Sequence, residues 1–364
     1  MYEKYSFLGE EETSVKTFPE AMEVCKNRER VVLTAKYKDL NITDTGQIVI
    51  GKAEHQITSW GFEKLCAILG IPKPFARKIP EDLLKENIAR LLKEKNGDDE
   101  INFFNSKKGL LGVAKKQNDP FENIDFLTQM STLHSGTAEI HDIIVSDRGV
   151  TLNFFSPSIP NLEPVKGDIT RVGFNTHNSD TGGAPSTSHL FLYRLACENG
   201  AIMKEIWGTA KRTYNKKITK ETSLLNFQKQ TEQISTNAAL LSSCFTKMID
   251  MEVTDEFFRK IWTTVKRVVG SEAVVDEALE ISKETRKEMF AGISKRKNNN
   301  RRKLISDVPA EVAVPIGRTY YELYNQTTAM EKGFRLDERI NLRKAGGDIL
   351  YSVLKTEVAL VDEE

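Results

Sequence analysis

Between residues 101 and 175 the chain is built from short runs rich in β-branched and aromatic residues. Glycine, proline or asparagine separates these runs from one another. The runs are INFFN, GLLGVAK, EIHDIIVSD, GVTLNFFS and DITRVGFNT. Segments of this length between turn-forming residues are typical of β-strands. We therefore predict a β-rich centre, which restricts the chain to folds built around a sheet.

The segments before this centre predict a mixture of strands and helices. Residues 31–50 contain two short β-rich runs joined by a turn signal, as in a hairpin. Residues 57–71 and 80–99 carry apolar residues at helical spacing, and Thr58 or Ser59 can cap the first of these helices. The N-terminal part therefore combines strands with at least two amphipathic helices.

From about residue 221 onward the pattern is helical. Apolar residues recur at three- and four-residue spacing over 231–249, 254–270, 272–293 and 317–333. A shorter helix is expected at the C-terminus.

These patterns predict an α+β fold with a β-rich central region, an N-terminal α/β segment and a helical C-terminal region. The predicted boundaries are 1–100 for the N-terminal α+β region, 101–220 for the central region and 221–364 for the helical region. With 364 residues the chain is long enough for two or three domains. The sequence leaves open whether these regions are independent domains or one interwoven unit.

Composition restricts the partners that the whole surface can attract. Lysine and arginine number 52, and aspartate and glutamate also number 52, so no global field draws the chain to nucleic acid or to an anionic membrane. Binding of either kind would require local patches. The chain lacks an N-terminal signal pattern and an 18-residue apolar run, and none of its four cysteines forms a C-x-x-C pair. We expect a soluble cytoplasmic protein without a membrane partner.

One stretch, NTHNSDTGGAPSTSHLFLYRLACENGAI (175–202), changes from polar to apolar half-way along. We predict a polar loop that leads into a buried helix over His189–Cys197, capped among Ser186–Ser188 and ended by Asn199-Gly200. The N-terminus of such a helix would offer backbone N–H groups to a phosphate. The alternative is a capped helix after a turn, without a ligand.

This stretch resembles the phage/plasmid-like protein family, also called domain of unknown function 932. In that family an N-S-E-x-G segment precedes an apolar helix that ends in R-x-x-C-x-N-G. The matching residues here are Asn178, Ser179, Asp180, Gly182, Arg194, Cys197, Asn199 and Gly200, with Asp180 where the family usually has glutamate. The segments ITSWGFEKLCAILGIPKPF and GRTYYELYNQTTAM resemble the family's N-terminal and C-terminal helices. The resemblance implies carriage on a phage, prophage or plasmid, and it supplies no activity.

The same stretch holds residue types that could perform chemistry. His177, Asp180 and His189 could bind a metal ion, but their spacing matches no metal motif, and ordinary hydrogen bonds would also satisfy them. Arg194 lies in an apolar run and needs a partner, and Asp180 is a candidate that would make the motif a structural clasp. Cys197 is expected to be a buried, inert thiol. We expect no catalytic residue, no bound metal and no cofactor.

Two basic segments favour nucleic-acid binding. Residues 204–220 combine six cations with Trp207 and Tyr214, and residues 295–303 (KRKNNNRRK) hold six cations and no acid. Cations that contact phosphates, interleaved with rings that stack on bases, are typical of proteins that bind single strands. Solvated surface is the alternative for both. The predicted nucleic-acid-binding residues are Arg194, Lys211, Arg212, Tyr214, Lys216, Lys217, Lys295, Arg296, Lys297, Arg301, Arg302 and Lys303.

The sequence thus predicts a sequence-tolerant single-stranded-DNA-binding protein of a phage or mobile element that acts in replication or recombination, with strand annealing as a related activity. Homo-oligomers and replication or recombination proteins are expected partners, and DNA is not distinguished from RNA. One alternative is a metal-dependent nuclease-type enzyme centred on His177, Asp180 and His189. The other is a protein-binding inhibitor of a host defence system.

Overall fold

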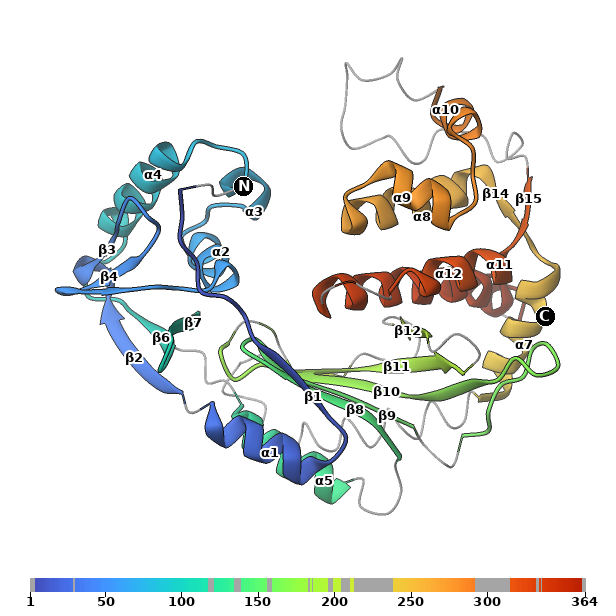
Figure 1. The fold of residues 1–364 in the computed structure, drawn as a ribbon, viewed down its shortest axis with the longest axis horizontal. Coiled ribbons are helices and arrows are strands. Elements are labelled where there is room, and N and C mark those ends of the chain that lie inside the picture. Colours follow the sequence, from blue (N-terminus) through green and yellow to red (C-terminus); the bar gives the residue numbers. More distant parts are fainter. Residues whose placement is uncertain are drawn as a thin grey trace. The chain divides into compact units, whose positions relative to one another are not determined.

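The computed structural model describes residues 4–28, 30–116, 121–133, 139–155, 159–182, 184, 186–195, 199–203, 210–212, 238–291, 315–331, 334 and 336–361. The predicted α+β fold with a β-rich centre is confirmed, and helices dominate the C-terminal part (Figure 1). Contacts divide the chain into two compact units. Unit 1 comprises Met1–Phe154, Asn175–Ser188 and Ala210–Gln228, and unit 2 comprises Phe155–Phe174, His189–Thr209 and Lys229–Glu364.

Two small sheets and three helices form the first part of unit 1. One sheet has the order β2-β6-β7 and the other β3-β4-β5, with antiparallel neighbours throughout. The strands are β2 (Val31–Lys36), β3 (Leu40–Ile42), β4 (Ile48–Ile50), β5 (Ala53–His55), β6 (Glu100–Ser106) and β7 (Gly109–Lys115). The helices are α2 (Ser59–Ile68), α3 (Lys73–Ala76) and α4 (Glu81–Glu94).

The sequence patterns explain these elements, with one difference in strand pairing. Thr58 caps α2 as predicted, because its Oγ1 accepts a hydrogen bond of 3.0 Å from the Gly61 N–H. Residues 31–50 hold three strands instead of two, since β2 pairs with β6 and only β3 and β4 form the hairpin. The apolar faces of α2 and α4 are buried in a common core with residues of β6 and β7.

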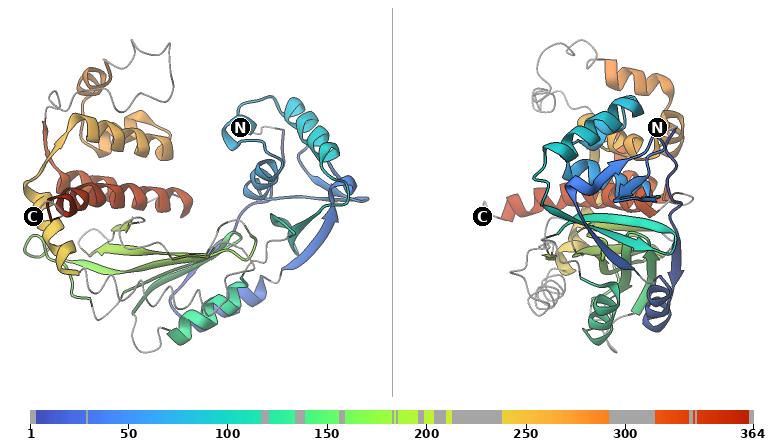
Figure 2. Two further views of the ribbon diagram at one scale, coloured as in Figure 1. Left: turned by 180° about the vertical axis from the view of Figure 1, so that it is seen from behind. Right: turned by 90° about the vertical axis from the view of Figure 1, so that its left-hand side faces the viewer.

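The first two runs of the β-rich centre form β6 and β7 of the smaller sheet, and a seven-stranded sheet contains the later strands. Its order is β1-β8-β9-β10-β11-β12, and β13 also pairs with β11. The strands are β1 (Glu12–Val15), β8 (Glu139–Ser146), β9 (Gly149–Phe155), β10 (Thr170–Asn178), β11 (Ser186–Arg194), β12 (Asn199–Met203) and β13 (Ala210–Arg212). Two helices absent from the sequence prediction, α1 (Phe18–Asn27) and α5 (Asn123–Leu133), lie side by side in unit 1 (Figures 1 and 2).

The helix predicted over His189–Cys197 is wrong. Residues 189–194 belong to strand β11, and Asn199-Gly200 opens β12 instead of ending a helix. A short apolar run cannot be assigned to a helix or a strand by periodicity alone, and here pairing with neighbouring strands satisfies its backbone groups. The predicted phosphate site at a helix N-terminus over Ser186–Ser188 is therefore wrong as well, because these residues begin a strand.

The described helices of unit 2 follow the predicted pattern with two differences. Helix α8 is capped by Thr254 and ends at Gly270, whose φ is 79°. The single helix predicted over 272–293 is divided into α9 and α10, and Glu280 between them has a φ of 50°. The C-terminal helix α12 has 26 residues and is longer than predicted. The helices are α7 (Ala238–Asp250), α8 (Asp255–Val269), α9 (Glu272–Ala278), α10 (Lys283–Ala291), α11 (Tyr320–Ala329) and α12 (Leu336–Val361).

Strands β14 (Glu252–Thr254) and β15 (Pro315–Thr319) form a two-stranded sheet beside these helices. Helix α12 packs against α11 and β12, and the small residue Gly346 permits this approach. A Cβ atom at that position would lie 2.6 Å from the Thr328 side chain. Among the described residues, no helix has the length and apolar character required to cross a bilayer.

Candidate functional site

The two faces of strands β8 and β9 differ in character. One face carries apolar side chains that are almost completely buried: Ile143, Val145, Val150, Leu152 and Phe154. Helices α1 and α5 lie on the side of these strands that this face occupies (Figure 1). Because successive side chains of a strand point to opposite faces, the residues between these apolar ones form a second face.

This second face carries the buried Ile144 and a group of polar residues, and we call that polar group the polar face. Within unit 1 its members come from β8, β9, β10 and β11, and all of them can donate or accept hydrogen bonds. They are Asp142, Thr151, Asn153, Asn175, His177 and Thr187.

A row of hydrogen bonds crosses three strands of the polar face. Asn153 Nδ2 donates to Asp142 Oδ1 at 2.5 Å, and Asn175 Nδ2 donates to Asn153 Oδ1 at 2.6 Å. Beside this row, Thr151 Oγ1 and His177 Nδ1 are 3.1 Å apart. Residues opposite each other on neighbouring strands project to the same side of a sheet, and these hydrogen bonds therefore join side chains of one face.

Burial divides the polar face into a middle and a rim. Thr151, Asn153 and Asn175 have exposed fractions of 2%, 0% and 4%, whereas Asp142 and His177 are half-buried. Buried polar groups destabilise a fold unless they are hydrogen-bonded, and the row satisfies this condition. Asp142 and His177 are therefore the less buried members of the face.

Two predicted cations lie in the strand next to this face. Strand β13 pairs with the start of β11, with Lys211 opposite Thr187 and Arg212 opposite Ser186. The structure thus places Lys211 and Arg212 in a fixed backbone register beside a member of the polar face. Tyr214, Lys216 and Lys217 lie outside the described residues, as does Trp207.

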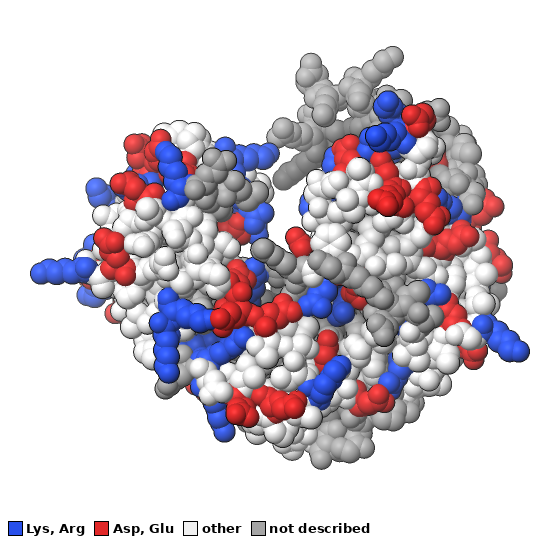
Figure 3. All heavy atoms as spheres, in the orientation of Figure 1, with Lys and Arg blue, Asp and Glu red and all other residues white. Residues whose placement is uncertain are grey.

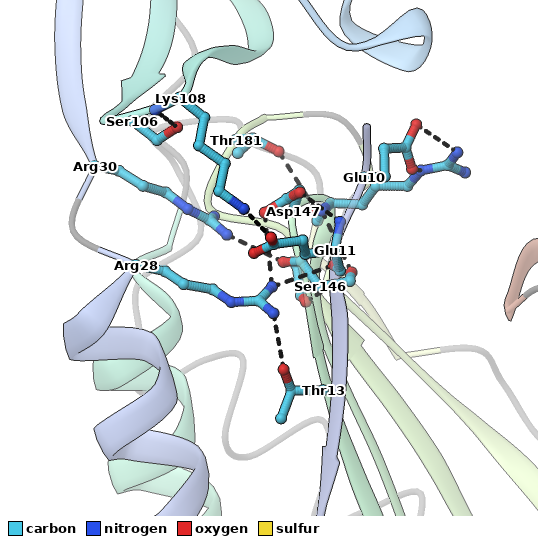
Figure 4. Close-up of polar contacts among 12 residues, drawn as sticks. Glu10, Glu11, Thr13, Arg28, Arg30, Ser106, Lys108, Ser146, Asp147 and Thr181 are labelled. Carbon is cyan, nitrogen blue, oxygen red and sulfur yellow. Dashed lines mark hydrogen bonds and ion pairs between the residues drawn. The ribbon is translucent and has the colours of Figure 1, made fainter. Parts of the chain in front are cut away.

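The acid of the sequence motif has a different partner from the predicted one. Asp180 forms an ion pair with Arg30, which lies between α1 and β2, and not with Arg194. The Arg30 guanidinium also donates to the Ser146 carbonyl oxygen at 3.1 Å (Figure 4). Burial lowers the pKa of Arg30 to about 10. The clasp interpretation of Asp180 agrees with this ion pair, although the proposed partner was wrong.

Other motif residues also have structural contacts. Asn178 Nδ2 donates to the Phe121 carbonyl oxygen and to Asn123 Oδ1, each at 2.8 Å, and Asn178 Oδ1 accepts from Ser186 at 2.6 Å. Gly182 has a φ of 69°, and a Cβ there would lie 2.6 Å from the Ala114 Cβ. The contacts of these motif residues hold the loop in place.

A network of ion pairs surrounds the clasp (Figure 4). Arg148 Nε lies 2.6 Å from a Glu10 carboxylate oxygen, and Arg28 lies 3.6 Å from Asp147. Lys108 pairs with Glu11. Each of these three cations, like Arg30, has an acidic partner within unit 1. We therefore do not include them among candidate phosphate contacts.

Arg194, predicted to contact nucleic acid, is held inside unit 2. Its Nε and Nη2 atoms donate to the two carboxylate oxygens of Asp168, each at 2.5 Å, and the Tyr321 hydroxyl donates to the same carboxylate. Burial raises the pKa of Asp168, but the hydrogen bonds from Arg194 and Tyr321 outweigh it and the net pKa is lowered. Burial also raises the pKa of Tyr321 to about 12. Because Arg194 donates to both carboxylate oxygens of Asp168, it acts as a structural residue.

The second basic segment, which contains Lys295, Arg296, Lys297, Arg301, Arg302 and Lys303, lies outside the described residues. The described elements before and after it are anchored. On α10, Arg286 lies 2.8 Å from Asp276 and 3.0 Å from Glu272, and the Asp276 carboxylate also accepts from the Trp262 ring nitrogen at 2.9 Å. After the segment, β15 pairs with β14.

The three residues predicted for a metal-enzyme alternative are not grouped to hold a metal ion in the described structure. Asp180 pairs with Arg30 and His177 contacts Thr151, while His189 lies half-buried on β11. In the part of the chain that the structure describes, no three His, Cys, Asp or Glu side chains are grouped to hold a metal ion. Burial raises the pKa of the Cys66 thiol to about 12, which disfavours its reactive thiolate form.

Sequence reasoning missed the polar face itself. The signal was the alternation Val150, Thr151, Leu152, Asn153 in β9, which places polar residues on one side of the strand. The hydrogen-bond row across neighbouring strands depends on their register, which this alternation does not specify.

No protein-family model matches the chain, and no curated protein or solved structure shows significant similarity to it. Its function is therefore inferred from its own residues.

Proposed function

We propose that this protein binds single-stranded DNA without strong sequence preference and that unit 1 carries the binding surface. The observation that supports this proposal best is the position of β13. Its hydrogen-bonded register with β11 places Lys211 opposite Thr187 of the polar face, and the next cation, Arg212, opposite Ser186. Cations for phosphates next to hydrogen-bonding groups for bases are the combination that single-strand binding needs.

The shape of the surface favours a single strand over a duplex. Proteins that read the major groove insert a helix or a two-stranded ribbon into it. Here the half-buried hydrogen-bonding groups, Asp142, His177 and Thr187, come from three different strands of one sheet. The bases of a single strand are exposed and can lie on such a face.

The distribution of charge indicates that the protein makes few contacts with the phosphates of a bound strand. On the visible surface, lysine and arginine are interspersed with aspartate and glutamate and form no broad basic patch (Figure 3). The cations around the Asp180 clasp are paired with acids. Affinity should therefore depend on salt, with a slope that reflects a small number of contacts.

The biological setting comes from the family resemblance alone. A phage- or plasmid-borne protein of this kind would act in replication or recombination in the cytoplasm of the host bacterium. The proposal includes self-association and strand annealing, because proteins that coat single strands usually bind cooperatively.

Fluorescence anisotropy tests the proposal directly. Labelled single-stranded DNA, duplex DNA and single-stranded RNA of equal length would be titrated with the full chain at several salt concentrations. We expect the single-stranded DNA to bind most tightly and its affinity to fall with salt. Lys211→Ala should weaken binding several-fold and lower the salt slope by about 0.7.

A matched control removes two charges far from β13 in the sequence. Lys93 and Lys95 are exposed residues of α4 and its C-terminal end, so Lys93→Ala/Lys95→Ala should leave the affinity and the slope unchanged. Absence of binding at low salt, or equal effects of the β13 and control substitutions, would contradict the proposal.

A further inference from the structure

Strand β2 forms one edge of the three-stranded sheet β2-β6-β7 in unit 1. Among the described strands its neighbour is β6 alone, so the second side of β2 carries backbone groups that no described strand pairs. Open N–H and C=O groups at the edge of a sheet can pair with a strand of another chain, and folded proteins usually protect them.

The register of β2 against β6 shows which backbone groups face outward. The Tyr37 N–H, one residue beyond β2, donates to the Asp99 carbonyl oxygen at 3.1 Å and continues the ladder. Hydrogen-bonded positions alternate along an antiparallel pair, so the odd-numbered residues of β2 exchange their hydrogen bonds with β6. The N–H and C=O groups of the even-numbered residues, Val32 and Thr34 among them, therefore point to the open edge.

The side chains at the start of β2 are apolar and exposed. Val31 and Val32 have exposed fractions of 56% and 52%. Successive side chains point to opposite faces of a strand, so apolar surface flanks the open backbone groups on both faces. Charged residues usually protect such an edge, but the one cation in β2, Lys36, lies at its far end, 3.3 Å from Asp98. The start of β2 is therefore an unprotected edge.

We propose that β2 is a self-association surface, at which two copies of the chain pair their β2 strands antiparallel about a two-fold axis at Val32. The two three-stranded sheets would then form one continuous sheet. This inference names the interface of the self-association included in the proposed function and rests on that part of it.

The position of the axis follows from the residues that it brings together. With the axis at Val32, the outward groups of Val32 in the two copies form a reciprocal pair of hydrogen bonds, and Val31 lies opposite Leu33 of the second copy. Apolar pairs of this kind stabilise a sheet. Moving the axis to Val31 or to Leu33 would place Arg30 opposite Val32 or opposite Lys36. The axis at Val32 therefore gives the most favourable pairs.

A second copy is the partner that this edge fits best, because the apolar start of β2 is complementary to itself in the proposed register. The charge of the whole chain does not oppose the pairing. With 52 basic and 52 acidic residues, the chain has no net charge that would keep two copies apart.

Sedimentation velocity of the full chain, over a range of concentrations and without nucleic acid, tests the surface. We expect dimers whose fraction rises with concentration. Val32→Lys places two like charges opposite each other at the axis and should weaken dimerisation more than about tenfold. Leu83→Lys introduces the same charge at a 50% exposed apolar residue of α4 and should leave dimerisation unchanged.

Cysteine cross-linking tests the register. The Cα atoms of a hydrogen-bonded antiparallel pair lie about 5.5 Å apart, which a disulfide can bridge, so Val32→Cys should form a covalent dimer on mild oxidation. Thr34→Cys, at an exposed position with the same backbone orientation, should not. In this register the two copies of residue 34 are offset by four residues, or about 14 Å at about 3.4 Å per residue. The unchanged chain gives the baseline for its own four cysteines.

Three outcomes would overturn the inference: a chain that stays monomeric, dimerisation that Val32→Lys leaves intact, or a covalent dimer of Thr34→Cys instead of Val32→Cys. Circular dichroism would verify that each variant is folded. Because these measurements use no DNA, they are separate from the test of single-strand binding. A chain that dimerises through β2 but binds no single strand would support this interface and contradict the proposed binding.

Discussion

Strands β8 and β9 carry two faces made from the same stretches of chain, and the faces obey different physical rules. On one face, Val145, Val150 and Leu152 are buried apolar residues, which is sufficient to stabilise a sheet. On the other, Thr151 and Asn153 are just as buried but require hydrogen-bond partners. A face that served packing alone would not need this polar row, which is why we propose the binding function for it.

The loop around Asp180 shows that polar character alone does not identify a binding surface. Its charge is paired with Arg30, and Asn178 has three side-chain hydrogen bonds within unit 1. On the polar face, by contrast, Asp142 accepts one described side-chain hydrogen bond. Among the described residues, the two regions differ in the partner of the acid, which is the guanidinium of Arg30 at Asp180 and the amide of Asn153 at Asp142.

The largest effect is expected on the apolar face. Leu152 is completely buried, so Leu152→Ala should lower the free energy of unfolding by about 2–5 kcal/mol, through lost apolar contact and a cavity. Urea denaturation measures this change. The affinity of the folded variant for single-stranded DNA should be unaffected. If the variant lost affinity under conditions in which it is fully folded, the two faces would not be separate in function.

An intermediate effect is expected from Asn153→Leu on the polar face. The substitution removes the donor to Asp142 and the acceptor for Asn175, and a buried polar group left without a partner destabilises by about 1–3 kcal/mol. Unlike Leu152→Ala, it should also weaken binding of single-stranded DNA. If it altered stability alone, the polar face would be a structural network like the Asp180 loop.

A smaller effect is expected from Thr151→Val, which keeps the side-chain shape and removes the hydroxyl that contacts His177. Loss of one hydrogen bond should lower the free energy of unfolding by about 1 kcal/mol. Thermal unfolding measures this change. Thr176→Val, which removes a buried hydroxyl bonded to Ser188 on the other side of the sheet, is a matched control for stability.

The smallest effect at neutral pH concerns the fully paired carboxylate of unit 2. Because the net pKa of Asp168 is lowered in the folded state, its contribution to stability is present above the ordinary carboxyl pKa of about 4. That contribution is lost as the pH falls through the lower folded value. Urea unfolding between pH 2 and 7 should show this loss in the wild type. Asp168→Asn should lack it, and an identical pH profile would contradict the pairing.

Local patterns predicted much of the fold. The β-branched runs of 101–175 form strands, and capping at Thr58 and Thr254 marks helix starts. Strand β11 was mistaken for a helix because its apolar run is short and continuous, without a clear period. Helices α1 and α5 were missed.

The candidate site was only partly predictable. Lys211 and Arg212 stood out as a basic pair next to aromatic residues, and they remain in the proposed interface. Arg194 looked similar in sequence, yet Asp168 and Tyr321 engage it. Its partners precede it by 26 positions and follow it by more than a hundred, so no local pattern could indicate them.

By itself the sequence determined the alternation of polar and apolar residues along each strand, the caps of several helices and the presence of basic segments. These features depend on residues a few positions apart, where backbone geometry relates side chains directly. Only the tertiary structure decided that Asp142, Asn153 and Asn175 form one row and that Asp180 pairs with Arg30. Strand register and the close approach of distant segments create these pairs, and both depend on the packing of the whole unit.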